Sequence, residues 1–152
     1  MSEKNINFQK LYLEKKYSEI ILEIENLDEK QRSPGLLNLL GACKLLRRDT
    51  NDLMSANSHF RAAYIKEKTT KIGLEALINF INSIAEIFDE KIEIIEDNQI
   101  SSLIDEAILY FDDADKYFGF NEKLILAIVR IYKRQNNLEK ILFYLKKLID
   151  NK

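Results

Sequence analysis

Several residue types that shape other folds are scarce in this chain of 152 residues. It has one cysteine, one proline, four glycines, one histidine and no tryptophan. The single cysteine, Cys43, excludes an internal disulfide and favours a reducing compartment, so we expect a cytoplasmic protein. The scarcity of glycine and proline argues against a turn-rich β architecture and favours long helices. The single histidine, His59, excludes any site that needs two imidazoles.

Long apolar runs are also missing. The longest uninterrupted one, Leu124 to Val129, is far too short to cross a bilayer, and we expect no secretory leader. The apolar fraction of 46% and the charged fraction of 32% are nevertheless typical of a folded globular chain. We therefore expect a single domain over residues 1–152, with no membrane partner.

Acidic and basic residues are unevenly divided along the chain. Residues 1–71 hold 13 bases and 10 acids, residues 72–115 hold one base and 12 acids, and residues 116–152 hold nine bases and three acids. This division indicates head-to-tail association or a partner with complementary patches, although solvated helix faces with internal ion pairs are the plainer alternative. The pI near 5.6 and the lack of interleaved aromatic and basic residues disfavour a nucleic-acid partner.

Apolar residues recur at steps of three and four over most of the chain, which predicts α-helices separated by short polar turns. Residues 89–99 are open to two interpretations, a longer helix or a loop packed by Ile92, Ile94 and Ile95. The pattern predicts seven or eight helices in an antiparallel array. The expected helix boundaries are residues suited to cap backbone groups, namely Ser33–Pro34, Thr69–Thr70, Ser101–Ser102, Gly119, Asn121 and Asn136–Asn137.

A small–large–small spacing recurs in every second predicted helix. A small residue lets two helices approach closely, and a large one four positions later fills the groove beside it. The spacing predicts helical hairpins at about 5–32, 33–68, 70–118 and 121–150. It is carried by Ala56, Phe60 and Ala63, then by Ala107, Phe111 and Ala114, and with larger side chains by Ile20, Ile24 and Leu27 and by Ile141, Leu145 and Leu148.

The first helix of three hairpins carries a second pattern, seen in Leu37-Asn38-Leu39-Leu40-Gly41, in Leu77 to Asn82, and in Ile125, Ile128 and Tyr132. With the small–large spacing, it resembles the tetratricopeptide repeat family over nearly the whole chain, in degenerate copies. The signature tryptophan is absent, and the turn near Arg47–Asp52 is about three residues longer than in the family. The resemblance implies an all-α, superhelical array of antiparallel hairpins, and the rival fold is an irregular helical bundle.

In the tetratricopeptide family the first helices line a concave groove that binds a peptide, and the resemblance implies the same here. Amides can bond an extended backbone as donor and acceptor, so we expect a peptide or protein partner. An acidic partner would suit the cations, which can take a carboxylate. The family's clamp for a peptide C-terminus fits poorly, because Asn38, Ala42 and Ala127 stand where it needs Lys, Asn and Arg. The alternative is an ordinary solvated face. The positions that match the groove are Asn38, Ala42, Glu75, Asn79, Asn82, Glu86, Lys123, Arg130, Lys133 and Arg134. Among them, the residues expected to bind the partner are Asn38, Asn79, Asn82, Lys123, Arg130 and Lys133.

No catalytic or cofactor-binding constellation is found. Cys43 and His59 are interpreted as structural. The carboxylates around Asp113 invite a calcium site, but Gly119 and Leu124 stand where such a loop needs other residues. Neither Gly35 nor Gly41 is followed by the residues of a phosphate-binding loop. We therefore expect a protein that is not an enzyme, with no cofactor and no metal.

The segment Ile141–Ile149 is too apolar around its circumference for a surface helix. We expect Leu142, Phe143 and Ile149 to contact another domain or another copy. The sequence thus predicts a protein-binding scaffold. The alternatives are a self-associating regulatory or assembly protein, and the N-terminal scaffold of a larger bacterial transferase.

Overall fold

The computed structural model describes residues 6–90 and 96–151. Within these ranges the chain is all-helical, as predicted, with eight α-helices and no strand. A short 3₁₀ turn, Glu29–Gln31, separates the second and third helices. The helices are α1 (Phe8–Leu13), α2 (Tyr17–Glu25), α3 (Pro34–Arg47), α4 (Asp52–Lys66), α5 (Lys71–Glu90), α6 (Asp97–Phe118), α7 (Glu122–Arg134) and α8 (Leu138–Asp150).

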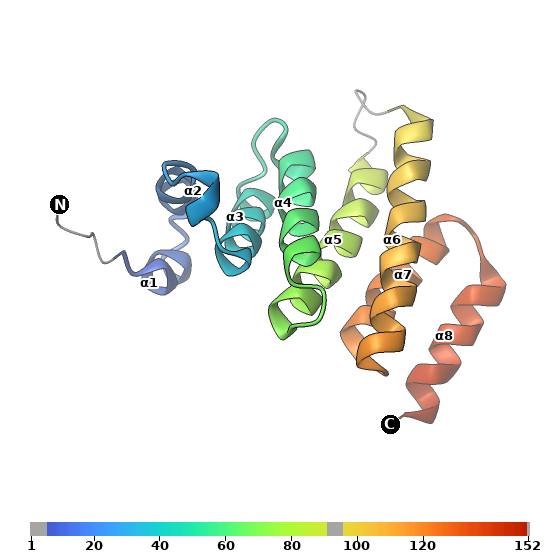
Figure 1. Ribbon diagram of the computed structural model, residues 1–152. Helices are drawn as coiled ribbons and strands as arrows, with labels where there is room; N and C mark the ends of the chain where they lie inside the picture. The colour runs from blue at the N-terminus through green and yellow to red at the C-terminus, as the bar shows by residue number, and fades with distance from the viewer. Residues whose placement is uncertain (1–5, 91–95, 152) are drawn as a thin grey trace.

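Consecutive helices run in opposite directions and form an elongated stack with the two chain ends at opposite extremes (Figure 1). The helices α3, α5 and α7 lie side by side, with α5 packed between the other two. The even-numbered helices pack on this row: α4 contacts α3 and α5, α6 contacts α5 and α7, and α8 contacts α7. Each helix therefore packs chiefly against its nearest neighbours in the stack.

Helix boundaries largely follow the local capping residues. The Ser33 hydroxyl accepts from the Leu36 N–H at 3.2 Å and Pro34 takes the first helical position, as predicted. Gly119 ends α6 with a φ of 75°, a conformation that glycine adopts without strain. Asn121 caps α7 through its side-chain oxygen. Asn137 does the same for α8.

The predicted start at Ser101–Ser102 is wrong, because α6 begins at Asp97. The Gln99 side chain accepts from the Glu96 N–H at 3.1 Å, so the first turn is stabilised before the serines are reached. Of the acidic stretch 89–99, residues 89 and 90 belong to α5 and residues 97–99 belong to α6. The predicted roles of Ile92, Ile94 and Ile95 fall outside the described residues.

The small–large spacing marks buried contacts between helices. Ala56, Phe60 and Ala63 are fully buried, and so are their counterparts on α6 apart from the slightly accessible Ala114. Gly41 of α3 lies against the Phe60 ring, where a Cβ would stand 2.6 Å from a ring carbon. The large residue of α4 thus makes a close approach to α3 at the glycine of the first-helix pattern.

Two hydrophobic cores run through the stack. The larger one joins α3 to α8. The smaller one lies between α2 and α3 and contains Ile20, Ile21, Ile24, Leu40 and Cys43. Because α3 contributes Leu37 to the larger core and Leu40 to the smaller one, this helix lies between the two cores. Cys43 is buried, and burial raises the pKa of its thiol to about 11, which agrees with the structural role predicted for it.

The uneven charge of the sequence is partly balanced within the fold. Ion pairs join acidic α5 and α6 to basic residues elsewhere in the fold: Arg48 with Glu86, Arg61 with Glu106, and Arg134 with Asp89. A looser pair, Lys147 with Asp115, joins α8 to α6 at 3.8 Å. These ion pairs join the acidic middle of the chain to the more basic segments on either side of it.

Candidate functional site

The six polar residues predicted to line a groove all lie on the row α3, α5 and α7, and the structure pairs four of them. The Asn79 amide donates from Nδ2 to the Asn38 Oδ1 at 3.0 Å, which joins α5 to α3. Arg130 of α7 donates from Nη1 to the Asn82 Oδ1 at 2.9 Å, which joins α7 to α5. We call the surface formed by these side chains the odd-helix face.

Two hollows open on the odd-helix face, on either side of the Asn38–Asn79 pair. The first, of about 390 Å³, lies between α1 and α3. The second, of about 430 Å³, lies between the N-terminal ends of α5 and α7. The lining residues are Phe8, Gln9, Tyr12, Gly35, Asn38, Leu39 and Ala42 in the first, and Lys71, Leu74, Glu75, Ile78, Asn121, Glu122 and Lys123 in the second.

The two hollows differ in chemistry. Aromatic and aliphatic side chains, with the Asn38 amide, line the first one, which suits an apolar side chain next to a hydrogen-bonding backbone. Charges of both signs surround the second one, where Lys71 and Lys123 stand beside Glu75 and Glu122. Of the predicted cations, Lys123 and Lys133 are exposed, and neither has an ion-pair partner within residues 6–90 and 96–151.

A charged cluster on α3, α5 and α7 was not predicted from the sequence. Arg48, just after α3, pairs with Glu86 and Glu90 of α5. Arg134 of α7 makes a two-pronged contact with the Asp89 carboxylate, which lowers the pKa of Asp89. A hint in the sequence was the spacing of Glu86 and Glu90, which puts two acids on one helix face.

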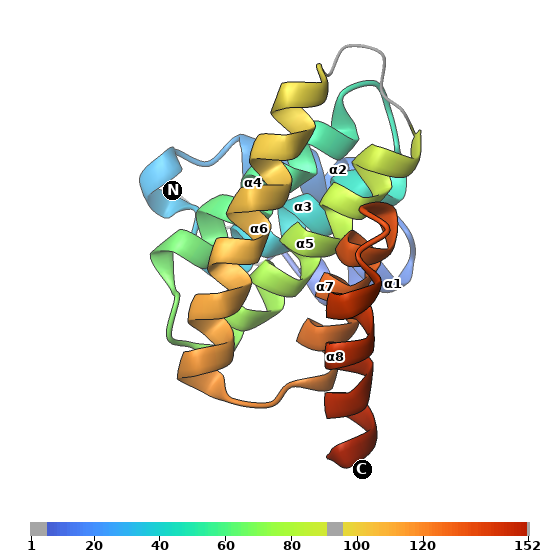
Figure 2. The ribbon, with the colours of Figure 1, turned by 90° about the vertical axis from the view of Figure 1, so that its right-hand side faces the viewer.

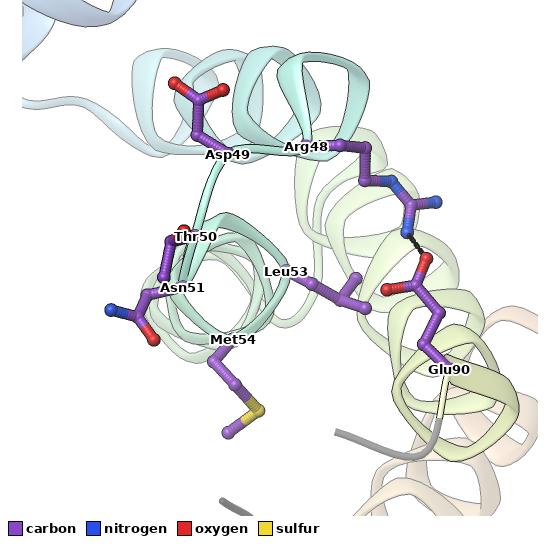
Figure 3. A pocket seen from close by; sticks show the side chains of 7 residues that line it. All are labelled: Arg48, Asp49, Thr50, Asn51, Leu53, Met54 and Glu90. Atoms are coloured by element: carbon purple, nitrogen blue, oxygen red, sulfur yellow. Dashed lines mark hydrogen bonds and ion pairs between the residues drawn. The ribbon is translucent and has the colours of Figure 1, made fainter. Parts of the chain in front are cut away.

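A further pocket, of about 410 Å³, lies beside the turn between α3 and α4. Figure 3 shows Arg48 reaching across it to Glu90, while the Asp49 and Asn51 side chains point away from that pair. The cation of this pocket, Arg48, is therefore already paired with the Glu90 carboxylate. We place the candidate binding site on the odd-helix face instead, where two exposed lysines remain.

His59 belongs to a polar cluster between α3 and α4. The Lys44 Nζ lies 2.8 Å from the Ser55 Oγ, 3.1 Å from the His59 Nε2 and 3.4 Å from the Glu25 Oε2. Because an ammonium can only donate, Nε2 must accept and the ring must be neutral. Burial, with the Lys44 charge beside it, lowers the pKa of His59 to about 4. The partly buried position of His59 agrees with the predicted structural role.

The three apolar residues predicted to contact another domain or copy are exposed on α8. They do not form one stripe. Leu142 and Ile149 are seven positions apart and share a side of the helix, and Leu138 joins them four positions earlier. Phe143 lies about 100° further round. It packs edge-on to Tyr144, beside the Lys147 ammonium.

Comparison with known proteins gives no relative for this chain: no family model, no curated protein and no solved structure matches it. In the part of the chain that the structure describes, none of the helices has the length and apolarity that crossing a membrane requires.

Proposed function

We propose that this protein is a tetratricopeptide-like scaffold that binds an extended, acidic segment of a partner protein along the odd-helix face. The observation that carries the proposal is the placement of two hollows on the odd-helix face, one between α1 and α3 and one between α5 and α7, with the Asn38–Asn79 pair between them. An extended peptide presents alternate side chains and a backbone that both donates and accepts, so it matches hollows separated by amides.

The polar pairs of this face support the proposal because they are neutral or solvent-accessible. Asn38 and Asn79 are both half-buried. Either amide can exchange its present bond for one to a peptide backbone at small cost, since the two bonds are of the same kind. Arg130 already meets a neutral amide oxygen rather than a carboxylate, which leaves its charge uncompensated by the Asn82 contact. Together with the exposed Lys123 and Lys133, it favours an acidic ligand.

The test is selection of peptides from a random library on the full chain, followed by affinity measurement with the enriched sequences. We expect acidic peptides to be enriched. The double variant Lys123→Glu, Lys133→Glu should weaken their binding at least about tenfold, because two attractive charges become repulsive. Asn79→Ala should weaken neutral members of the selected set as well, because it removes a backbone contact.

Matched controls come from exposed lysines on the even-numbered helices. Lys66 of α4 and Lys116 of α6 are both exposed, and neither lines the two hollows. Lys66→Glu with Lys116→Glu changes the net charge by the same amount. Equal loss of binding in both double variants, or a library that yields no enriched peptide, would show that the odd-helix face is not the binding site.

A further inference from the structure

The side of α8 that carries Leu138, Leu142 and Ile149 is apolar and uncovered. These side chains are 71%, 66% and 71% exposed. Figure 2 looks onto this end of the stack, where α8 lies in front of the other helices. Three large aliphatic residues on one side of a 13-residue helix form a surface that favours contact with another protein.

The inner hairpins show what normally lies on this side of an even-numbered helix. Ile141, Leu145 and Leu148 repeat the spacing of Ala56, Phe60 and Ala63, so Leu138, Leu142 and Ile149 correspond to Leu53, Asn57 and Tyr64 of α4. All three of those α4 residues are buried. The Asn57 Nδ2 bonds the Ser83 Oγ of α5 at 2.8 Å, so a neighbouring helix covers this side of α4. The occupant that fits α8 is therefore another helix.

Charged residues beside Leu138, Leu142 and Ile149, which together we call the apolar stripe, indicate which helix covers this side of α8. Leu138, Leu142 and Ile149 are four and seven positions apart, which fits a coiled-coil seam whose remaining position, Leu145, is partly buried and packs on the protein's own core. Glu139 and Lys146 occupy the same seam-flanking position, one heptad apart. They are exposed, and neither has an ion-pair partner within the described part of the chain.

We propose that α8 is a dimer interface, at which two copies of this protein pair their α8 helices in antiparallel fashion. Antiparallel pairing brings equivalent flanks together in reversed order, so Glu139 faces the partner's Lys146, and Lys146 faces the partner's Glu139. Parallel pairing would instead place Glu139 and Lys146 opposite the partner's Ile141 and Leu148, which pack on the core of their own copy, and no ion pair would form. The two-fold arrangement therefore buries the apolar stripe and forms two ion pairs from a single pair of residues.

The oligomeric state of the full chain, measured by sedimentation equilibrium, tests the proposal. We expect a dimer for the unaltered protein and a monomer for Leu142→Glu, with unchanged circular dichroism because Leu142 is mostly exposed. Leu109 is also exposed, but it lies on α6 outside the stripe. Leu109→Glu is therefore the matched control and should remain dimeric.

A charge exchange tests the antiparallel pairing itself. Glu139→Lys alone sets like charges against each other at two symmetric places and should raise the dissociation constant about tenfold. Combining it with Lys146→Glu restores both pairs in reversed sense, so the double variant should return to within about threefold of the unaltered protein. A monomeric unaltered chain, a dimeric Leu142→Glu variant, or a double variant as weak as the single one would each overturn the proposal.

Discussion

At the scale of single residues, two glycines of this chain have opposite roles despite similar positions. Gly35 and Gly73 both lie in the first turn of a helix. A Cβ on Gly35 would meet only the Ser33 Oγ, at 3.9 Å. A Cβ on Gly73 would stand 1.6 Å from the Glu67 carbonyl oxygen, so only glycine fits there. The difference arises from the turn before α5, which folds the Glu67 backbone against the helix.

This contrast predicts opposite signs for the same substitution. Gly35→Ala should leave the free energy of unfolding unchanged or raise it by up to about 1 kcal/mol, because alanine favours helix and restricts the unfolded chain. Gly73→Ala should lower the free energy of unfolding by about 2 kcal/mol or more, because the backbone at Glu67 would have to move to make room for the methyl group. Urea unfolding followed by circular dichroism gives both values. A stabilised Gly73→Ala variant would contradict the close contact with Glu67.

Sequence reasoning finds such residues only when their partner is part of a recognised pattern. Gly41 belongs to the first-helix pattern of the repeat, and Phe60 of the small–large pattern lies against it. Gly73 has no such position in the pattern. Its need for glycine comes from the path of the preceding turn, which periodicity does not describe.

At the scale of helices and turns, predictions were accurate at three helix caps whose contacts are local, while the equally local Glu96–Gln99 contact at the start of α6 was missed. The caps at Ser33, Asn121 and Asn137 span three residues and could be read directly from the sequence. Contacts between helices were not predictable in the same way. The pairing of Asn79 with Asn38, and of Arg48 with Glu86, depends on how far each helix is shifted along its neighbour. The sequence predicted that Asn38 and Asn79 lie on the first helices of two hairpins, but not that they pair.

The contact between α3 and α4 predicts a pH dependence of stability. His59 has an ordinary pKa of 6.5 when unfolded and about 4 in the fold, so between these values the unfolded chain binds a proton that the native one does not. The free energy of unfolding should therefore fall as the pH falls from 6.5 towards 4, by about 1 kcal/mol per pH unit. Urea titrations at pH 7, 6 and 5 measure the slope.

The variant His59→Gln isolates this contribution. Glutamine can still accept from Lys44, but it has no titrating group in this range. Its stability should therefore change much less between pH 7 and 5. Asp52 and Asp89, whose pKa values are lowered by Arg47 and Arg134, contribute equally to both proteins. Identical slopes for the two proteins would mean that His59 is protonated in the native state.

At the scale of the whole molecule, the stack has two cores and contacts mainly between neighbours. Stability in such an array is a sum of local terms, so one end can open while the rest stays folded. The smaller core depends on α2, whose Ile20 and Ile24 are fully buried. The hairpin α1–α2 is thus expected to open on its own, independently of α5 and α7.

Weakening the smaller core should affect only its own end of the stack. Ile24→Ala removes buried methyl groups and should destabilise the α1–α2 hairpin by about 2–4 kcal/mol. Hydrogen exchange measured by mass spectrometry should then show faster exchange in residues 8–25 and unchanged exchange in α5 and α7. Faster exchange of equal size in α5 would mean that the stack unfolds as a single unit.

The position of the only cysteine has a practical consequence. Cys43 is completely buried in the smaller core, and its thiol becomes accessible when α2 leaves α3. A thiol reagent therefore acts as a clock for the opening of one end of the molecule, with no background from other cysteines. Its rate of reaction therefore reports the opening of the first hairpin separately from pairing at α8, which lies at the other end of the stack (Figure 1).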